Sequence, residues 1–423
     1  MRHDDPVPDT TVPQHCPSAR ELDDLELLSI GALGDGRFED ADGLATLVVP
    51  AAVGRAALDS GQVELVDPEG LPLALLAVES SYDAPDSRTG LSGAVTVLGH
   101  HEFGPFRHLY PTPAEVREEH PAETLTVPVS APLTDQDLAP LRDHGGPVLL
   151  LALAGTGTPR GVSPVGLVRA TRAAAALLPD AAVAVVALAT LGDPVRDAER
   201  HRQVVAAFAP GAVRDVPGAG DLPEEVADIV RHDRPGPDEQ GLVLFFTGLS
   251  GSGKSTLARA LHDRVLEAGR RTVTSLDGDV VRRHLSAGLT FSKSDRETNI
   301  RRIGWVAAEI SRHGGVAICS PIAPFDATRR QVRAMIEEAG GAFVLIHVAT
   351  PLEECERRDR KGLYAKARRG EIPEFTGISS PYEEPEDATV RVDTTGRSIE
   401  DALADVLAPL AARLGLSTPD DTW

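Results

Sequence analysis

The chain has 423 residues, of which 42% are hydrophobic and 25% are charged. This composition is typical of globular proteins, and the length predicts two or three domains, so a single small module and a mainly disordered chain are excluded. The 42 basic and 64 acidic residues give a net charge of −22. Because so acidic a surface repels nucleic-acid backbones and anionic lipids, we expect neither a nucleic-acid partner nor a membrane partner.

The acidic residues are concentrated in the first half of the chain. Residues 1–240 contain 17 basic and 38 acidic residues, whereas residues 241–423 contain 25 and 26. All four lysines also lie in this second, nearly neutral half. A site for an anionic small molecule is therefore expected there.

The cysteines and the N-terminus predict the compartment. Three cysteines without close spacing cannot form a disulfide framework, so we expect an intracellular, cytoplasmic protein. Residues 1–20 have no apolar segment and predict a flexible tail, and no run of 18 apolar residues predicts a membrane span. His100 and His101 are adjacent, but no cysteine or carboxylate cluster accompanies them, so we interpret them as a surface or structural pair rather than as metal ligands.

Short apolar runs separated by turn residues follow the tail. Leu44 to Val49 and Leu71 to Leu76 are two of these runs. They predict strands, and we expect a β-rich domain over 21–110.

From residue 111 the pattern changes to alternating helices and strands. Thr112 opens a Thr-Pro-Ala-Glu capping box, which predicts a helix start. Val148 to Ala154 and Ala182 to Ala189 predict buried strands on either side of an alanine-rich helix. Residues 111–215 are therefore expected to form an α/β segment.

A phosphate-binding loop follows a predicted linker at 216–240, which is rich in glycine and proline. Leu242 to Thr247 predicts an apolar strand that leads directly into G-x-x-x-x-G-K-S, from Gly248 to Ser255. Apolar residues then recur at helical spacing. In this context backbone N–H groups and the helix N-terminus bind nucleotide phosphates.

The loop predicts a nucleotide and Mg²⁺ as ligands. Lys254 is expected to reach the β- and γ-phosphate oxygens and to take part in catalysis, and the hydroxyl of Ser255 to bind Mg²⁺. The expected nucleotide-binding residues are Gly248, Ser250, Gly251, Gly253, Lys254, Ser255 and Thr256.

Two acidic residues follow the next predicted strand. Thr272 to Leu276 is followed by Asp277, a glycine and Asp279, beside the phosphate loop. One of the carboxylates is expected to bind Mg²⁺ or to accept a hydroxyl proton. The alternative is a solvent-exposed turn, because Asp-Gly is common in turns.

Two later segments present basic side chains. Arg296, Asn299 and Arg302 recur every three residues, so they share a helical face that can bind an anion. The basic segment 357–369 follows the predicted strand 343–348 and suits a lid that closes over phosphates. The alternative for both segments is a charged helix exposed to solvent.

Together these motifs resemble the adenylylsulfate kinase (APS kinase) family over 241–417. Its motifs occur here in the family's order: the phosphate loop, Asp-Gly-Asp, the helix 291–303, Lys-Gly-Leu-Tyr from Lys361, and Phe-Thr-Gly-Ile from Phe375. The resemblance implies an α/β P-loop kinase with a parallel sheet. It also implies transfer of the γ-phosphoryl group of ATP to the ribose 3′-hydroxyl of adenylyl sulfate, in sulfate assimilation.

The resemblance further implies roles for single residues. Asp279 would orient or deprotonate the 3′-hydroxyl and bind Mg²⁺ together with Ser255. The implied substrate-binding residues are Arg282, Phe291, Arg296, Asn299, Lys361 and Phe375, with the two phenylalanines on either side of the adenine. A homodimer is also implied.

The chain departs from the family pattern at two positions. Val280 stands where an asparagine usually follows Asp-Gly-Asp, and Ala323 stands where some relatives have a serine that carries phosphate. A phosphoenzyme at Ala323 is therefore excluded. Direct transfer is still expected, because it needs positioning and charge stabilisation rather than a protein nucleophile.

The first half resembles, more faintly, the ATP sulfurylase that is fused to this kinase in some proteins. The resemblance implies a PUA-like domain over 21–110. The sulfurylase pattern Q-x-R-N-P-x-H-x-x-H is expected after the strand 148–154, but residues 155–164 contain no histidine. We therefore expect a shortened remnant without ATP sulfurylase activity over 111–215.

Two alternatives to an adenylyl sulfate kinase remain open. One is a regulatory module that binds adenylyl sulfate or its phosphorylated product without turnover and associates with a separate ATP sulfurylase. The other is a kinase for a different hydroxylated metabolite. The joint presence of Lys254, Ser255 and Asp279 favours catalysis, and the second alternative gives no reason for the four residues Phe291, Arg296, Asn299 and Phe375.

Overall fold

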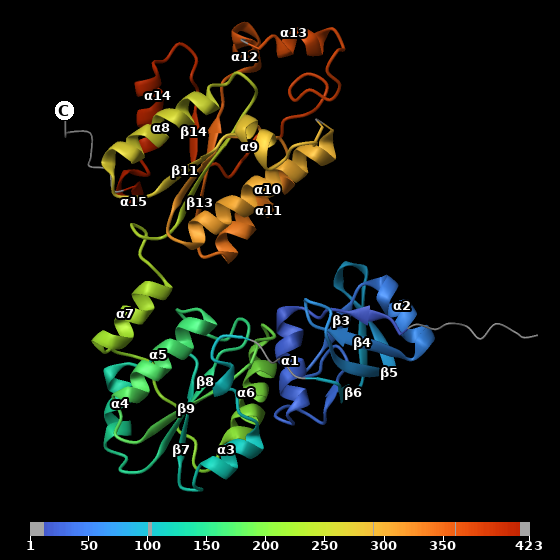
Figure 1. Cartoon of the computed structure of the whole chain (residues 1–423), viewed down its shortest axis with the longest axis vertical. Coiled ribbons are helices and arrows are strands. Elements are labelled where there is room, and N and C mark those ends of the chain that lie inside the picture. Colours follow the sequence, from blue (N-terminus) through green and yellow to red (C-terminus); the bar gives the residue numbers. More distant parts are fainter. Residues whose placement is uncertain (1–11, 100–103, 291, 360, 415–423) are drawn as a thin grey trace, which may run out of the picture. The chain divides into compact units, whose positions relative to one another are not determined.

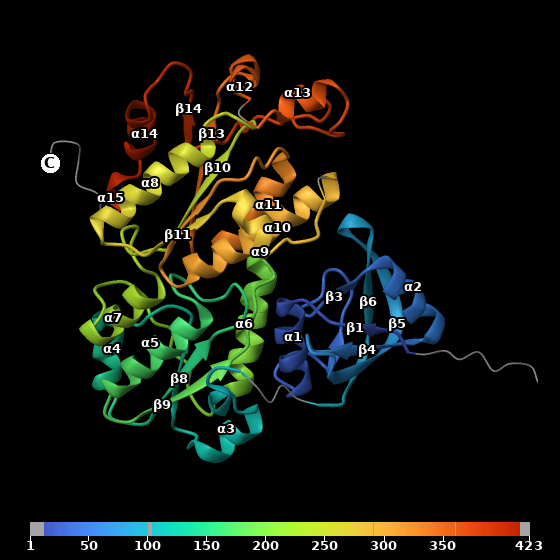
Figure 2. The same ribbon diagram turned by 45° about the horizontal axis from the view of Figure 1, so that its top comes forward.

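The computed structural model describes residues 12–99, 104–290, 292–359 and 361–414. The chain divides into two compact units, Met1–Arg234 and Pro235–Trp423. Figures 1 and 2 show their elements coloured along the sequence. No helix in the described ranges is long and apolar enough to cross a membrane.

The first unit begins with a mixed sheet. Its described strands lie in the order β1-β4-β5-β6-β2, and β3 also pairs with β6. All pairs are antiparallel except β1 with β4. The elements are β1 (Gln14–His15), α1 (Ala19–Ser29), β2 (Arg37–Phe38), β3 (Leu47–Val49), α2 (Ala51–Ser60), β4 (Gln62–Val66), β5 (Pro72–Ala84), a 3₁₀ turn (Pro85–Ser87) and β6 (Arg88–Val97).

Part of the expected tail is regular structure. Within residues 12–20, Gln14 and His15 pair with β4, and Ser18 caps α1. Ser18 forms a capping box with Glu21, in which each side chain accepts a hydrogen bond from the other residue's backbone N–H. The flexible-tail prediction is wrong for these residues, because it missed the Ser-x-x-Glu spacing that begins a helix.

A parallel three-stranded sheet follows, in the order β7-β8-β9 within the described residues. The helix predicted from Thr112 is confirmed, with Thr112 and Glu115 forming its capping box. The elements are a 3₁₀ turn (Arg107–Leu109), α3 (Pro113–Glu119), β7 (Leu125–Val129), α4 (Asp135–Arg142), β8 (Val148–Leu153), α5 (Pro164–Ala176), β9 (Ala181–Val186), α6 (Pro194–Phe208) and α7 (Glu224–Asp233).

Helix α7 lies inside the range expected to be a linker. Its Val226 is fully buried in the core beneath α5, and the carboxylate of Asp233 accepts hydrogen bonds from the N–H and hydroxyl of Ser163. Residues 224–233 therefore belong to the packed first unit, because the apolar face of α7 is buried there. The linker prediction was based on the glycine and proline residues on both sides of α7.

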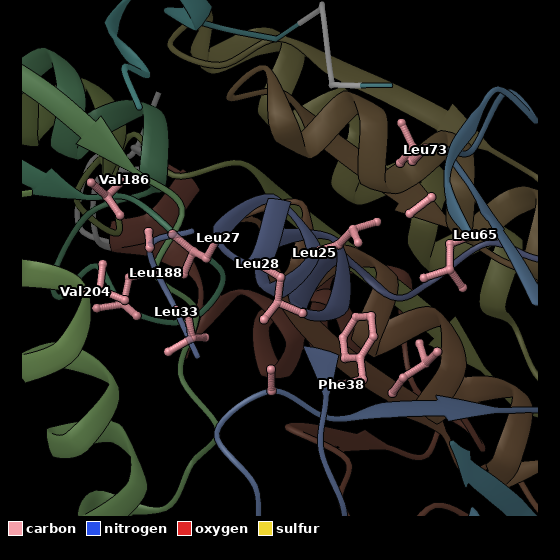
Figure 3. Close-up of a cluster of buried hydrophobic side chains, with 14 of the residues drawn as sticks. Leu25, Leu27, Leu28, Leu33, Phe38, Leu65, Leu73, Val186, Leu188 and Val204 are labelled. Carbon is pink, nitrogen blue, oxygen red and sulfur yellow. The ribbon is translucent and has the colours of Figure 1, made fainter. Parts of the chain in front are cut away.

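The mixed sheet and the parallel sheet share one hydrophobic cluster (Figure 3). Helix α1 contributes leucines that pack against both sheets. The buried residues labelled in Figure 3 are Leu25, Leu27, Leu28, Leu33, Phe38, Leu65, Leu73, Val186, Leu188 and Val204. Next to the cluster, Asp24 and Arg200 form an ion pair in which both side chains are fully buried. The two parts of the first unit are thus held together by both apolar and charged contacts.

The second unit is a parallel sheet between two layers of helices (Figure 2). Its described strands lie in the order β11-β12-β10-β13-β14. The elements are β10 (Leu242–Thr247), α8 (Lys254–Ala268), β11 (Val273–Leu276), α9 (Gly278–His284), α10 (Lys293–Arg312), β12 (Val316–Cys319), α11 (Asp326–Glu338), β13 (Ala342–Val348), α12 (Leu352–Arg358), α13 (Leu363–Arg368), β14 (Val390–Val392), α14 (Ile399–Leu407) and α15 (Ala411–Leu414).

Successive side chains of β10 point to opposite faces of the sheet and fill the hydrophobic cores on both faces. Leu242, Leu244 and Phe246 pack on the face covered by α8 and α14, whereas Val243 and Phe245 pack on the face covered by α10 and α11. Because all neighbouring strands are parallel, their carboxyl ends lie at one edge of the sheet. In such sheets this edge binds ligands.

Candidate active site

The phosphate loop connects β10 to α8 at the carboxyl edge of the sheet. Gly248, Gly251 and Gly253 have φ of +146°, +77° and +100°, which side chains disfavour. At Gly248 a Cβ atom would also lie 2.4 Å from the carbonyl oxygen of Val348. Only glycine fits this turn, and the predicted strand-loop-helix unit is confirmed.

Lys254 is the first residue of α8, and it lies inside the loop with 6% of its surface exposed. Its Nζ donates to the carbonyl oxygen of Leu249 at 2.7 Å and to Oγ of Ser252 at 3.4 Å. Burial lowers the pKa of Lys254 to about 8. The ammonium group therefore begins to lose its proton only slightly above neutral pH.

Two serines contact the carboxylate of Asp277 at the end of β11. Oγ of Ser255, in the phosphate loop, donates to Oδ2 of Asp277 at 3.1 Å, and Oγ of Ser320, after β12, donates to the same atom at 3.1 Å. Hydroxyl and carboxylate oxygens are ligands that Mg²⁺ prefers. The described residues contain no group of three or more His, Cys, Asp and Glu that could hold a metal.

The sequence predicts Mg²⁺ binding by Ser255 together with a carboxylate of the Asp-Gly-Asp motif, for which Asp279 is the expected residue. The backbone of Asp279 lies in the first turn of α9, but its side chain is outside what the structure describes. Asp277 is the carboxylate that is found beside Ser255. Chain position alone did not distinguish the two acidic residues.

Arg296 on α10 reaches the segment 374–380, which follows α13. Its Nη1 donates to Oγ1 of Thr376 at 2.9 Å, and its Nη2 donates to Oγ of Ser380 at 3.3 Å. The guanidinium also lies 5.7 Å from the ring centroid of Phe325. Although only 12% of the side chain is exposed, Nε has no hydrogen-bond partner in the described part of the chain. A buried donor without a partner suits a polar ligand.

Asn299 lies one turn further along α10 and is also buried. Its Oδ1 has no partner among the described residues. Arg302, which shares the same spacing, is exposed and donates to the carbonyl oxygen of Leu285 at 3.0 Å. Only the first two residues of the predicted face therefore combine burial with unused hydrogen-bonding atoms.

The other predicted substrate-binding residues lie at several places in the second unit. Arg282, at the end of α9, donates to the carbonyl oxygen of Thr290 at 3.2 Å. Lys361 is exposed, just before α13. Phe375 lies in the segment that contacts Arg296. Phe291 is outside the described residues, as are His100 and His101 in the first unit.

Three polar residues that connect these elements were not predicted. Tyr364 on α13 is 3% exposed and donates from its hydroxyl to the carbonyl oxygen of Ser250, in the phosphate loop, at 2.8 Å. Thr376 and Ser380 hold Arg296. All three belong to or adjoin segments that carry sequence motifs, but they contact residues about 80 to 114 positions away in the chain.

A cavity of about 520 Å³ lies beside the phosphate loop. It is lined by Leu249 and by residues 377–382 and 384.

Of the two departures from the family pattern, Val280 is 41% exposed and Ala323 is buried with φ of +45°. The carbonyl oxygen of Ala323 accepts hydrogen bonds from Thr247 and Arg329, so its backbone is held although no hydroxyl is present.

Residues 240–393 match the family model described as adenylylsulphate kinase. The chain is also similar to two curated sulfate adenylyltransferases, from Neosartorya fischeri (46% identity over 186 residues) and Mycosarcoma maydis (47% over 192 residues). These alignments cover 44% and 45% of this chain but only 32% and 33% of those proteins. The chain thus spans about a third of the length of the curated relatives it matches.

Among solved structures, the fold is similar to a hexameric APS kinase from Thiobacillus denitrificans. The TM-score is 0.72 at 28% identity, and the alignment covers 96% of this chain and 94% of that chain. The likeness therefore extends over both units. The α/β fold, the parallel sheet and the P-loop kinase structure expected from the sequence are confirmed, and the C-terminal half of this chain contains an adenylylsulphate kinase domain.

Proposed function

We propose that this chain transfers the γ-phosphoryl group of ATP to the ribose 3′-hydroxyl of adenylyl sulfate. The observation that carries the proposal is that the phosphate loop and the segment that holds Arg296 are connected through Tyr364, within the residues that match the family model. The phosphate loop with Lys254 contacts Tyr364, and the segment next to Tyr364 holds Arg296, whose Nε has no partner within the described residues. A phosphate donor and an anionic acceptor would thus bind to connected elements.

On the donor side, each residue of the phosphate loop has a physical task. Backbone N–H groups between Gly248 and Thr256 would bind the phosphates, and Lys254 would follow the charge onto the transferred group. Ser255 and Asp277 would hold Mg²⁺, since their oxygens are hard ligands on adjacent elements. When bound, Mg²⁺ neutralises charge on the phosphate oxygens.

On the acceptor side, Arg296, Asn299 and Arg282 would bind the phosphosulfate and ribose. Phe375 would stack on the adenine, and Lys361 would approach over the phosphates. Two further roles rest on the resemblance alone: Phe291 as the second adenine contact, and Asp279 as the group that orients or deprotonates the 3′-hydroxyl. Transfer then needs only alignment of the two substrates and a proton acceptor.

Incubating the full chain with ATP, Mg²⁺ and adenylyl sulfate, and then resolving the nucleotides, tests this function. We expect ADP and 3′-phosphoadenylyl sulfate in equal amounts. Binding of adenylyl sulfate without ADP formation would instead support a regulatory module. ADP formation with another hydroxylated acceptor, but not with adenylyl sulfate, would contradict the proposed acceptor.

We also propose that the first unit is a sulfurylase remnant and makes no adenylyl sulfate. The curated relatives are named sulfate adenylyltransferases, so the proposed lack of this activity needs a direct test. In the loop after β8, Thr156 donates to Asp23 and Thr158 donates to the Leu188 carbonyl, and no histidine occurs at 155–164. We expect no sulfate-dependent pyrophosphate release from ATP by the full chain, and its detection would contradict the proposal.

The assembly and compartment are proposals as well. We propose a cytoplasmic protein that associates with copies of itself, as a homodimer according to the sequence resemblance. The similar chain from Thiobacillus denitrificans is described as hexameric. Light scattering coupled to size-exclusion chromatography distinguishes a dimer from a hexamer, and adding a separate ATP sulfurylase tests for association with that enzyme.

A further inference from the structure

Tyr364 connects two parts of the second unit that are expected to bind different substrates. These parts are the phosphate loop and the segment 374–380. The hydroxyl of Tyr364 donates to the carbonyl oxygen of Ser250 in the phosphate loop at 2.8 Å. No described peptide bond is cis, and in a planar trans peptide the carbonyl and the following N–H point in opposite directions. The hydroxyl therefore fixes the orientation of the N–H of Gly251. In phosphate loops such N–H groups bind the anion.

The ring of Tyr364 contacts the acceptor-side segment. It meets the ring of Phe375 edge-on, with the centroids 5.0 Å apart and the planes at 78°. This arrangement is a favourable one for an aromatic pair. Phe375 in turn begins a tight turn, because its carbonyl oxygen accepts hydrogen bonds from the N–H groups of residues 378–380. Thr376 and Ser380 in this turn hold Arg296.

A second contact joins the same two segments directly. Gly377 has φ of +90°, and a Cβ atom there would lie 3.0 Å from Cδ2 of Leu249. The Leu249 side chain therefore packs against the backbone of the acceptor-side turn. A shift of the phosphate loop at Leu249 or Ser250 would be transmitted to the turn through packed atoms rather than through solvent.

The backbone of Tyr364 is itself fixed by Asp359. The carboxylate of Asp359 accepts hydrogen bonds from the N–H of Tyr364 at 3.2 Å and from the N–H of Ala365 at 3.1 Å. Helix α13 is only six residues long, so these bonds hold its first turn. Tyr364 is consequently buried and restrained at its backbone, ring and hydroxyl.

We propose that Tyr364 is a positioning residue that couples nucleotide binding to acceptor binding. Its hydroxyl holds the phosphate loop in the form that receives the nucleotide, and its ring holds the turn that presents Arg296 to the acceptor. The acceptor half of this inference rests on the proposed function. The nucleotide half rests only on the phosphate loop.

Tyr364→Phe tests the inference, since it removes the hydroxyl and keeps the ring. Calorimetry would measure the affinity for Mg²⁺ and AMPPNP alone, and then the affinity for adenylyl sulfate with and without AMPPNP. A single hydrogen bond predicts a loss of about three- to tenfold in AMPPNP affinity. The ratio of the two adenylyl sulfate affinities, which measures coupling, should move towards 1.

Two further variants separate the ring from the hydroxyl. Phe375→Leu keeps the bond from Tyr364 to Ser250 but also removes the proposed adenine contact, so adenylyl sulfate should bind more weakly both with and without AMPPNP. The coupling ratio, in which this direct loss cancels, should move towards 1. Tyr110→Phe, in the first unit, is the matched control for losing a tyrosine hydroxyl, and both measurements should be unchanged. Circular dichroism and thermal melting check that each variant is folded.

An unchanged AMPPNP affinity in folded Tyr364→Phe would overturn the inference. A coupling ratio of 1 in the wild type would overturn it as well. If the wild type binds AMPPNP but not adenylyl sulfate, the proposed function fails. The AMPPNP measurement then still decides whether the hydroxyl orders the phosphate loop.

Discussion

The hydroxyl of Ser255 donates to the carboxylate of Asp277, with 3.1 Å between Oγ and Oδ2. Ser255 is the second residue of α8, whereas Asp277 directly follows β11, 22 residues later in the chain, so the contact joins two elements at the carboxyl edge of the sheet. Ser320 approaches the same carboxylate oxygen from a third element. A carboxylate held by two hydroxyl donors stays in place beside the phosphate loop.

The first prediction concerns this carboxylate. Asp277→Asn removes its negative charge with little change in shape, so Mg²⁺ should bind more weakly and kcat should fall by about 10²-fold or more at limiting Mg²⁺. Rates at increasing Mg²⁺ concentration measure both effects. Ser320→Ala, which removes a hydrogen bond but no charge, is the control and should have a smaller effect. Wild-type kcat at limiting Mg²⁺ in Asp277→Asn would contradict the metal site.

The second prediction concerns pH and Lys254. Because burial lowers its pKa to about 8, the protein without nucleotide loses this charge above that pH. Bound phosphates favour the protonated amine and raise the pKa, so binding above pH 8 requires proton uptake. The affinity for Mg²⁺ and AMPPNP should therefore fall about tenfold between pH 7 and pH 9. In Lys254→Met the affinity should be low, and this fall should be absent.

The third prediction concerns the stability of the first unit. Arg200→Met leaves the fully buried Asp24 with Arg20 as its one remaining ion-pair partner among the described residues, which should cost about 1 to 3 kcal/mol of unfolding free energy. Arg202→Met on the same helix is the control, since its ion pair with Glu199 is exposed, and it should cost less than about 0.5 kcal/mol. Urea denaturation followed by circular dichroism measures both. Equal stability of the two variants would contradict a structural role for the buried pair.

The predictable parts of this fold are those that depend on residues close together in the sequence. The phosphate loop is encoded by glycines at positions of positive φ, and the helix after Thr112 by its own capping box. The contact of Arg296 with Thr376 joins residues 80 positions apart, so no local spacing indicates it. The burial of Val226 likewise depends on a distant helix, which is why α7 was expected to lie in a linker.

The contact of Asp277 with Ser255 illustrates the same limit. Asp277 and Asp279 both follow one strand, and a carboxylate at either position suits a metal ion. The contact of Asp277 depends on how β11 is placed relative to α8, and the side chain of Asp279 lies outside the described part of the structure. The placement of β11 is set by packing across the sheet, not by the Asp-Gly-Asp sequence itself.

The last prediction concerns Arg296 and the identity of the acceptor. The guanidinium is nearly buried, is held by Thr376 and Ser380, and has an Nε without a partner in the described residues. If it pairs with the anionic group of adenylyl sulfate, Arg296→Ala leaves that charge unmatched, at a cost of about 2 to 5 kcal/mol. The KM for adenylyl sulfate should then rise by about 30-fold or more, and the KM for ATP should change little.

Arg302→Ala is the matched control, because Arg302 lies on the same helix but is exposed. It removes the same charge from the unit, so a purely long-range effect of charge would appear in both variants. We expect a large rise in KM for adenylyl sulfate in Arg296→Ala alone, measured by varying each substrate at saturating levels of the other. Equal weakening of ATP and adenylyl sulfate in Arg296→Ala would contradict the acceptor role, since it would mean that this arginine supports the phosphate loop instead.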